Sequence, residues 1–400
     1  PNARAGMKGV FAPTGAYVPG IDLVLKAGNI RGQDSNGMLC SEREMMISDE
    51  HDGIIDLDQE VPVGESFAAW AGLDDPVIEI AITPNRADCL GVRGVARDLA
   101  AAGYGTLKPL DTSAHEGSFD SPVTWRLDLD GAEHLAPLIT GIAFRGVTNG
   151  PCPDWMARRL NAIGQRPISA LVDITNYVMF DLGRPLHAYD IDKIHGSELI
   201  VRQADGGEPF AALNEKTYEM EAGMITIGDA EGVDDLAGVM GGERTGVSDG
   251  TTGMFLEIAV FDPISVATTG RKLNLNSDAR YRFERGLDSE SPVWAAGHIA
   301  RMVTEICGGE ASAPVTMGPG VDWKRSIFLG SGKVESLTGM VIDAGEQQRI
   351  LEALGFTVTS ADGGFDVAPP SWRGDIDGAA DLVEEIARIG GFDQLPMDHM

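Results

Sequence analysis

The stretch from Leu171 to Asp190 reads L-V-D-I-T-N-Y-V-M-F-D-L-G-R-P-L-H-A-Y-D. Its first half is mostly apolar, so the segment from Val172 to Met179 predicts a buried strand, which Thr175 and Asn176 interrupt with short polar side chains. A Gly-Arg-Pro turn follows, and His187 stands just beyond it. A sheet edge that carries Thr, Asn and His beside a turn can line a small polar pocket. The alternative is a buried hairpin in which the histidine is simply hydrogen-bonded.

Further motifs are spread over most of the chain. They are G-M-L-C-S-E-R-E (37–44), T-P-N-R-A-D-C-L (83–90), G-V-M-G-G-E (238–243), N-S-D-A-R-Y-R-F-E-R-G (276–286), S-W-R-G-D-I-D (371–377) and D-L-V-E-E-I (381–386). Together with the run described above, these motifs resemble the β subunit of bacterial phenylalanyl-tRNA synthetase (phenylalanine–tRNA ligase), in the family's order and nearly end to end. The resemblance implies a partial chain of such a subunit, with the 171–190 run in its editing region.

The composition is that of an ordinary globular protein. Hydrophobic residues make up 43% of the 400 residues, enough for a sizeable core shared among two to four domains. No segment is apolar and long enough to span a bilayer, and the N-terminus lacks the pattern of a secretory signal. The cysteines at 40, 89, 152 and 307 show no Cys-x-x-Cys spacing, which predicts a cytoplasmic protein without disulfides or zinc.

The charge of the chain limits what it can bind by itself. Sixty-one acidic residues against 31 basic ones give a formal net charge of −30. A protein that relies on phosphate contacts needs a basic face, so this charge argues against tight autonomous binding of nucleic acid. It suits a soluble metabolic enzyme or a salt-adapted acidic surface. The resemblance nevertheless implies contact with tRNA, with much of the affinity supplied by other parts of the protein, and neither DNA nor a membrane is expected as a partner.

The pattern of elements predicts a multidomain α+β protein. In residues 1–71, short strands broken by glycines predict a small β-barrel, which resembles part of the family's OB-like tRNA-binding domain. Residues 72–150 predict an α/β block, B1-like by resemblance, with a strand from Val77 to Ile82 and a helix from Val92 to Ala102. The Asn-Arg-Ala-Asp loop between strand and helix is either a functional loop or a turn that caps the helix.

Residues 151–313 predict an α+β domain that contains the candidate pocket. Gly241 follows an apolar stretch, as at the end of a strand where the backbone approaches a ligand closely. Glu257 lies in the apolar run F-L-E-I-A-V-F. Burying its carboxylate is costly unless a partner is present, so Glu257 either meets an arginine or points into the pocket.

The resemblance implies that this is the B3/B4 editing domain, which removes tyrosine wrongly attached to the phenylalanine tRNA. A pocket shaped for phenylalanine cannot strongly exclude the same ring with an added hydroxyl, so editing is needed. By resemblance, Glu257 accepts a hydrogen bond from the tyrosine hydroxyl and Arg166 meets the ribose or phosphate of the tRNA. The residues matching the family's catalytic positions are Thr175, Asn176, His187 and Glu257; those matching its substrate-binding positions are Arg166, Gly241, Ser277 and Ala279. Without a Ser/His/Asp triad, a positioned water is the expected nucleophile.

Residues 323–398 read strand, helix, strand, helix. A short helix is expected from Glu346 to Leu354, and an acidic helix with Leu382 and Ile386 on its apolar face ends the block. The acids around this helix either ligate a hard cation or form a solvated face near a helix N-terminus. The resemblance favours the first alternative: it implies a winged-helix-like B5 domain and a magnesium ion at the contact with the α subunit, held by Asp375, Asp381, Glu384 and Glu385.

No ATP-binding motif was identified, and no arginine-bearing motif of class II synthetases. The chain alone is therefore not expected to form an aminoacyl-adenylate. The resemblance implies that the α subunit activates the amino acid, that the holoenzyme uses ATP, and that the whole is an α₂β₂ ligase charging tRNA(Phe). A free-standing editing hydrolase and an RNA-binding module with a vestigial pocket remain as alternatives. Glu257 and His187 argue against a vestigial pocket, because a decayed site would fill with apolar residues.

Overall fold

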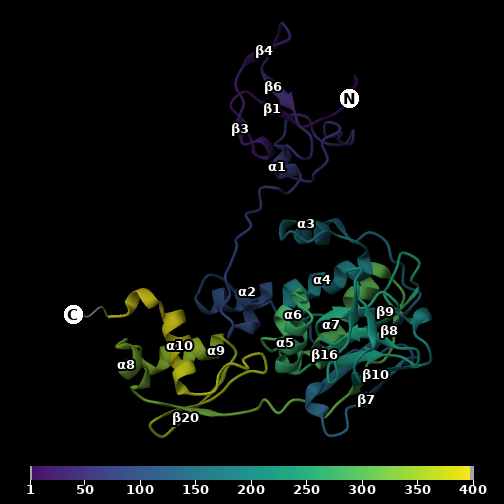
Figure 1. Cartoon of the computed structure of the whole chain (residues 1–400). Coiled ribbons are helices and arrows are strands. Elements are labelled where there is room, and N and C mark those ends of the chain that lie inside the picture. Colours follow the sequence, from purple (N-terminus) through teal and green to yellow (C-terminus); the bar gives the residue numbers. More distant parts are fainter. Residues whose placement is uncertain (1, 397–400) are drawn as a thin grey trace. The chain divides into compact units, whose positions relative to one another are not determined.

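The computed structural model describes residues 2–396 and divides the chain into two compact units, Pro1–Ile78 and Glu79–Met400 (Figure 1). The outer limits predicted for the first and last domains, residues 1 and 397–398, lie outside the described residues. Among the helices of the described residues, none combines the length and apolarity needed to cross a bilayer.

The first unit contains the short strands that its glycines predict. They pair in three antiparallel two-stranded sheets, and no closed barrel forms within residues 2–78. Its small core is built on Val10, Ala12, Val18 and Cys40. The paired strands are β1 (Phe11–Pro13) with β6 (Gly37–Leu39), β2 (Tyr17–Val18) with β3 (Leu23–Val24), and β4 (Gly28–Ile30) with β5 (Gln33–Ser35); the helix α1 covers Phe67–Trp70.

The prediction of a strand from Val77 to Ile82 is wrong. This segment lies outside any strand, and Val77, Ile78 and Ile80 are 62%, 76% and 52% exposed. An alternating pattern forms a strand only beside another strand that pairs with its backbone, and no described segment does so here. The helix predicted next is confirmed as α2 (Val92–Ala101), after which Gly103 takes a positive φ of 86°.

The central domain stacks two five-stranded sheets. Strands β7 and β8 come from the block predicted to end at residue 150, so both sheets extend across that limit. The first sheet runs β15 (Met240–Gly241), β14 (Val233–Leu236), β13 (Ile225–Gly228), β10 (Glu198–Gln203), β7 (Thr124–Asp128); the second runs β17 (Glu310–Ala311), β8 (Leu138–Arg145), β16 (Gly253–Val260), β9 (His187–Asp190), with β18 (Val315–Met317) also paired to β8. A hairpin of β11 (Pro209–Ala211) and β12 (Thr217–Glu219) lies outside these sheets.

The two-residue repeat of β16 separates the layers of this domain. Met254, Leu256 and Ile258 enter the core shared with the helices α3, α4 and α7, whereas Phe255 and Ala259 enter the core shared with the other sheet. Figure 1 shows the resulting order, with α4 and α7 beside β8, β9 and β16. Glu257 has the same parity as Phe255 and Ala259 and therefore faces the space between the sheets. The helices are α3 (Asp154–Ala162), α4 (Ala170–Leu182), α5 (Pro263–Lys272), α6 (Asp278–Phe283) and α7 (Ser291–Cys307).

The prediction of a buried strand from Val172 to Met179 is wrong, because this segment lies inside α4. A short apolar run does not distinguish a buried strand from a buried helix. Here Leu171, Ile174 and Val178 are buried at helical spacing in the core that α4 shares with the sheet. The helix continues over 13 residues without Gly or Pro, and ends at Gly183 with a left-handed φ of 69°.

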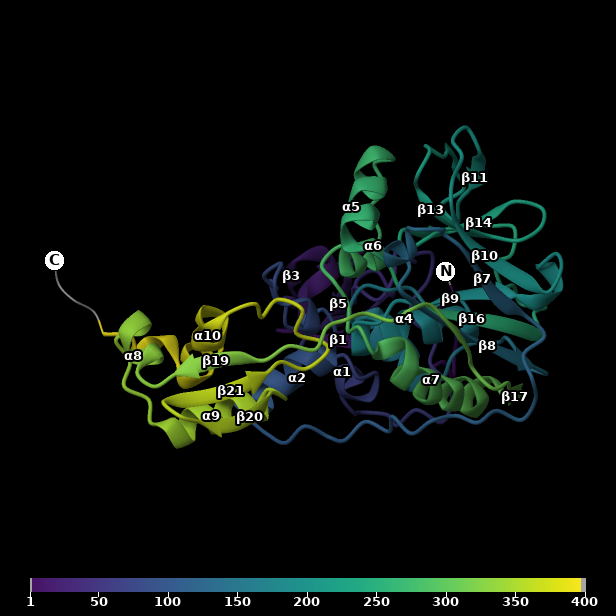
Figure 2. The same ribbon diagram turned by 90° about the horizontal axis from the view of Figure 1, so that it is seen from below.

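The last domain is a small α+β unit with the order strand, helix, helix, strand, strand, helix, which has one helix and one strand more than the predicted order. Its helices include those expected at 346–354 and around 381–386, both confirmed. Leu382 and Ile386 of the last helix are buried among residues of the other elements, as their spacing indicates. Figure 2 shows the three-stranded sheet beside these helices. The elements are β19 (Ile327–Gly330), β20 (Thr357–Ala361), β21 (Gly364–Ala368), α8 (Lys333–Thr338), α9 (Ala344–Ala353) and α10 (Ala379–Gly390).

Candidate functional site

Glu257 and His187 stand on neighbouring strands at the centre of the candidate site. They are direct cross-strand partners in the antiparallel pairing of β16 with β9. Glu257 is only 5% exposed. Directly opposed residues have neighbouring side chains on the same face of a sheet, so both groups face the space between the two sheets.

Gly241 approaches the histidine from the other sheet. A Cβ atom at Gly241 would lie 2.2 Å from Cε1 of His187, which no side chain allows. The position therefore requires glycine because the imidazole passes directly over its backbone. The sequence predicted that this backbone approaches a ligand closely; the group that lies against it in the structure is the side chain of His187.

Two residues that the sequence analysis missed complete the cluster. The hydroxyl of Tyr189 lies 3.1 Å from Oε2 of Glu257 and 3.3 Å from Oδ2 of Asp235. Tyr189 lies two residues after His187 in β9 and thus shares its face, and the rings of the two residues meet edge to face at 4.4 Å. Asp235 lies in β14, opposite Gly241. The signals for them were the H-A-Y alternation and a carboxylate within the short strand V-D-D-L.

Burial controls the protonation of these groups. It raises the pKa of Glu257 to about 7, although the hydrogen bond from Tyr189 and the charge of Arg184 act in the opposite direction. Burial also lowers the pKa of His187 to about 4, so its imidazole is neutral at pH 7. Nε2 of His187 has no hydrogen-bond partner among the described residues. A neutral imidazole with a free nitrogen can bind a water or a ligand atom.

The other residues predicted for this site lie outside the cluster of Glu257, His187 and Gly241. The hydroxyl of Ser277 donates to the carbonyl of Val239 at 2.6 Å, which ties the start of α6 to the segment just before Gly241. Ala279 packs against the core between the sheets. Thr175 and Asn176 lie on α4, where the Thr175 hydroxyl donates to the carbonyl of Val172 at 2.7 Å, and Arg166 is exposed. No hydrogen bond joins these last three residues to His187 or Glu257 within residues 2–396.

The four acids predicted to bind magnesium do not converge on one point. Asp375 accepts two hydrogen bonds from Arg373, both at 2.8 Å. Glu385 accepts from the same arginine and from Arg388, at 2.5 and 2.8 Å. One carboxylate oxygen of Asp381 caps α10 by accepting from the backbone N–H groups of residues 377 and 378, both at 2.9 Å. Glu384 is exposed.

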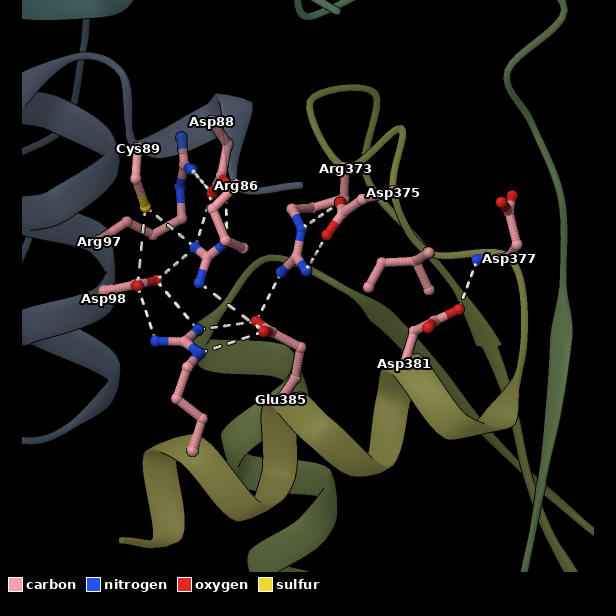
Figure 3. A network of polar contacts seen from close by, with 12 residues as sticks. Arg86, Asp88, Cys89, Arg97, Asp98, Arg373, Asp375, Asp377, Asp381 and Glu385 are labelled. Atoms are coloured by element: carbon pink, nitrogen blue, oxygen red, sulfur yellow. Dashed lines mark hydrogen bonds and ion pairs between the residues drawn. The ribbon is translucent and has the colours of Figure 1, made fainter. Parts of the chain in front are cut away.

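Glu385 instead belongs to an ion-pair network that joins α10 to the segment around α2 (Figure 3). Burial opposes its ionisation, but hydrogen bonds and charges from Arg388 and Arg373 outweigh this and lower the pKa of Glu385 to about 2. Arg388 also donates to Asp98 at 2.7 Å, and Arg86 donates to Asp98 at 3.0 Å and lies 3.7 Å from Glu385. The alternative of a solvated face does not hold for Glu385, because it is 2% exposed.

The loop before α2 takes part in this network. Arg86 pairs with Asp88 at 2.9 Å and with the sulfur of Cys89 at 3.0 Å. Asp88, Cys89 and Asp98 form the one group in the described chain whose ligand atoms are close enough to hold a metal ion. Because the guanidinium of Arg86 already contacts all three side chains, we assign them to the ion-pair network. For the Asn-Arg-Ala-Asp loop, this favours a structural role in fixing the start of α2 over a functional one.

Two parts of the chain match known domain families. Residues 135–308 match the B3/4 domain, and residues 327–392 match the tRNA synthetase B5 domain. The buried cluster of Glu257, His187 and Gly241 lies in the first of these domains, and the acids around α10 lie in the second. The class of protein that the fold and the matches define is thus an aminoacyl-tRNA synthetase component with both domains.

Its relatives identify the family within that class. The chain is 52% identical to the phenylalanine–tRNA ligase β subunit of Cereibacter sphaeroides, over 99% of this chain and 48% of that protein. The β subunits of Brucella abortus and Paramagnetospirillum magneticum are 50% and 49% identical, over 99% and 100% of this chain and 49% and 50% of theirs. The chain belongs to the family of phenylalanine–tRNA ligase β subunits, and it spans about half the length of these curated relatives.

A solved N-terminal fragment of a phenylalanyl-tRNA synthetase β subunit from Pyrococcus horikoshii is a more distant neighbour. It is 18% identical with a TM-score of 0.41, over 82% of this chain and 94% of that one.

Arg373→Ala should destabilise the last domain strongly. The side chain is 2% exposed, and its loss leaves Asp375 without its partner and Glu385 with one arginine fewer. Breaking a buried ion pair from one side costs about 3–5 kcal/mol. Urea unfolding monitored by tryptophan fluorescence measures the loss. Arg349→Ala, which removes an exposed pair with Glu346, is the control and should cost under about 1 kcal/mol. Equal effects would show that the network adds no stability.

Glu257→Gln should change how stability depends on pH. Since the pKa of Glu257 is raised to about 7, the native protein holds a proton that the unfolded chain releases from about pH 4.5 upward. The parent therefore loses stability as the pH rises from about 4.5 to about 7. Above pH 7, the free energy of unfolding of the variant should have risen relative to that of the parent by about 3 kcal/mol. Unfolding curves at several pH values measure this difference. Glu305→Gln, on the exposed side of α7, should show no such trend.

Proposed function

We propose that the chain forms the editing part of a phenylalanine–tRNA ligase β subunit and that its B3/4 domain hydrolyses tyrosine from mischarged tRNA(Phe). The observation that carries this proposal is the buried carboxylate of Glu257, which accepts a hydrogen bond from the phenol of Tyr189 between the two sheets of the domain. A carboxylate that can accept from one phenol can accept from the phenol of a bound tyrosine through its other oxygen. Phenylalanine offers no such donor, so the site rewards the hydroxyl group.

His187 is the group best suited to the ester end of the substrate. Its imidazole is neutral and its Nε2 is free, so it can hydrogen-bond the attacking water or the ester. The contact with the Gly241 backbone limits the positions that the ring can adopt. We assign Thr175 and Asn176 to holding the ester and orienting water, and Arg166 to the ribose or phosphate of the tRNA. Ser277 and Ala279 are assigned to the wall of the substrate pocket.

We further propose that the whole protein acts as an α₂β₂ ligase in the cytoplasm, where the α subunit uses ATP to activate phenylalanine. The family to which the chain belongs and its four free, buried cysteines support this. A magnesium ion at the contact with the α subunit would neutralise the acids of the B5 domain. Of the four proposed ligands, Asp381 and Glu384 fit this role better, because Asp375 and Glu385 are already paired with arginines. The α subunit would supply the remaining ligands.

Glu257→Ala in the full α/β enzyme should slow the release of tyrosine from Tyr-tRNA(Phe) while tRNA binding changes little. The lost hydrogen bond to a charged acceptor corresponds to about 1.5–3 kcal/mol, or about ten- to a hundredfold in selectivity for tyrosine over phenylalanine. His187→Ala should slow hydrolysis with a smaller effect on that selectivity. Single-turnover deacylation of Tyr-tRNA(Phe) and Phe-tRNA(Phe) measures both quantities.

The matched control for these two variants is Glu243→Ala, a carboxylate removal outside the buried cluster of the same domain. It should leave both rates unchanged. If Glu257→Ala and His187→Ala cleared Tyr-tRNA(Phe) at the parent rate, the assignment of the pocket would be wrong even though the family is known.

Asp381→Asn combined with Glu384→Gln should weaken magnesium-dependent association with the α subunit by about tenfold or more, because both substitutions remove hard anionic ligands. Asn at 381 can still accept the hydrogen bonds that cap α10, so the helix should remain intact. Analytical ultracentrifugation with and without magnesium measures association. Asp362→Asn with Asp366→Asn removes the same charge from exposed positions of the β20–β21 hairpin and is the control. If the magnesium dependence were unchanged, Asp381 and Glu384 would not be magnesium ligands and would form only part of a solvated face.

A further inference from the structure

We propose that Asp235 and Tyr189 form a directional hydrogen-bond relay that fixes one oxygen of Glu257 and leaves the other for the substrate. Both act through Glu257 and are therefore positioning residues. Neither is among the site residues that the resemblance to the family implies. The inference rests on the proposed editing function and deepens it, because it names the groups that set how strongly the site prefers a tyrosyl ester.

The relay spans both sheets of the central domain. Tyr189 comes from β9 and Glu257 from β16 in one sheet, while Asp235 comes from β14 in the other. The phenol stands between the two carboxyl groups, at 3.1 Å from Oε2 of Glu257 and 3.3 Å from Oδ2 of Asp235. Because β14 also pairs Asp235 with Gly241, the same strand holds the backbone that lies against His187. The relay and the imidazole are therefore anchored to the same two sheets.

Counting protons determines the direction of the relay. A phenol has one proton and can donate it to only one of the two carboxyl groups. The other contact is favourable only if that carboxyl group is itself protonated and donates to the phenol oxygen. Two ionised carboxylates at one buried hydroxyl would leave a desolvated negative charge without a donor, which is strongly unfavourable.

The surrounding charges decide which carboxyl group keeps the proton. Burial and the charges of Glu257 and Asp234 raise the pKa of Asp235 well above its usual range, although the hydrogen bond with Tyr189 acts in the opposite direction. For Glu257, the hydrogen bond from Tyr189 and the charge of the cation Arg184 oppose the effect of burial, and its pKa is raised only to about 7. His187 also faces this space, but it is neutral. Asp234 points to the opposite face of β14 and pairs there with Arg244 at 2.6 Å.

The resulting order is Asp235 O–H to Tyr189 O, then Tyr189 O–H to Oε2 of Glu257. Oε1 of Glu257 makes no hydrogen bond within the described residues, so it remains the free acceptor for the hydroxyl of a bound tyrosine. The carboxylate is held in orientation before the substrate arrives, which reduces the entropy lost on binding. The hydrogen bond from Tyr189 lowers the pKa of Glu257 and so favours its ionised form, which is the stronger acceptor.

The test uses the full α/β enzyme and the ratio of deacylation rates for Tyr-tRNA(Phe) and Phe-tRNA(Phe) between pH 5.5 and 8.5. The ratio cancels the ester chemistry and the titration of any group that acts on both substrates. In the parent, it should rise as Glu257 ionises. Tyr189→Phe removes the hydrogen bond that lowers the pKa of Glu257, so the midpoint of this rise should move up by about one pH unit. A merely structural loss would lower both rates without moving the midpoint.

Substitutions at Asp235 test where the proton lies. An asparagine amide can donate to the Tyr189 oxygen as a protonated carboxyl group does, so Asp235→Asn should retain most of the selectivity that Asp235→Ala loses. If asparagine were no better than alanine, or if Tyr189→Phe left the midpoint in place, the relay would be refuted. Tyr218→Phe removes a phenol from the β11–β12 hairpin of the same domain and is the control, with the midpoint expected at the parent value.

A second measurement does not depend on editing. In the isolated chain, the pH range over which Glu257 lowers stability should extend about one unit higher in Tyr189→Phe than in the parent. If the parent enzyme released no tyrosine from Tyr-tRNA(Phe), the proposed function would fail, and this stability profile would still confirm or refute the relay.

Discussion

Glu257 lies between the apolar residues Leu256 and Ile258 of β16 and is only 5% exposed, so its carboxyl group depends on hydrogen-bond partners that the fold supplies. The two-residue repeat of β16 makes this unavoidable, because the same alternation that sends Met254, Leu256 and Ile258 toward the helices sends Glu257 between the sheets. The adjacent strand then supplies His187 and Tyr189, and the facing sheet supplies Asp235 and Gly241. The site is therefore a consequence of how two sheets with fixed register cover one buried acid.

The sequence allowed part of this to be predicted. The helices α2, α9 and α10 were predicted from the sequence, α10 from its apolar spacing, and Glu257 was recognisable as a carboxylate within an apolar run. The segment now in α4 was misread because nearly all of its residues are apolar, so neither a period of two nor one of 3.6 dominates the pattern. The segment from Val77 to Ile82 was misread for the opposite reason: its alternation is clear, but a strand also needs a neighbour to pair with. The contact between Tyr189 and Asp235 could not be predicted, because it depends on the packing of two sheets.

The acids around α10 illustrate a second limit of sequence reasoning. Asp381, Glu384 and Glu385 fall at spacings that place them along one side of a helix, and a pattern of charges does not show which of them face arginines. Glu385 is buried because Arg373, Arg388 and Arg86 converge on it from three separate segments. The burial of such a cluster requires complete pairing, since each unpaired charge would be far more costly than the pairs are favourable. The same network therefore limits which of the acids can serve a metal ion.

The network around Arg86 also bears on how the chain acquires its structure. Arg388 lies 290 residues after Asp98, with the whole central domain between them. Closing so long a segment is entropically costly unless the intervening chain is already compact. During synthesis, the segment around α2 emerges long before α10. Until α10 is in place, Asp98 lacks its contact with Arg388 and Arg86 lacks its contact with Glu385. We therefore expect assembly to be ordered in time: the central domain folds first and brings its two flanking segments together, and the ion pairs between Arg388 and Asp98 form afterwards.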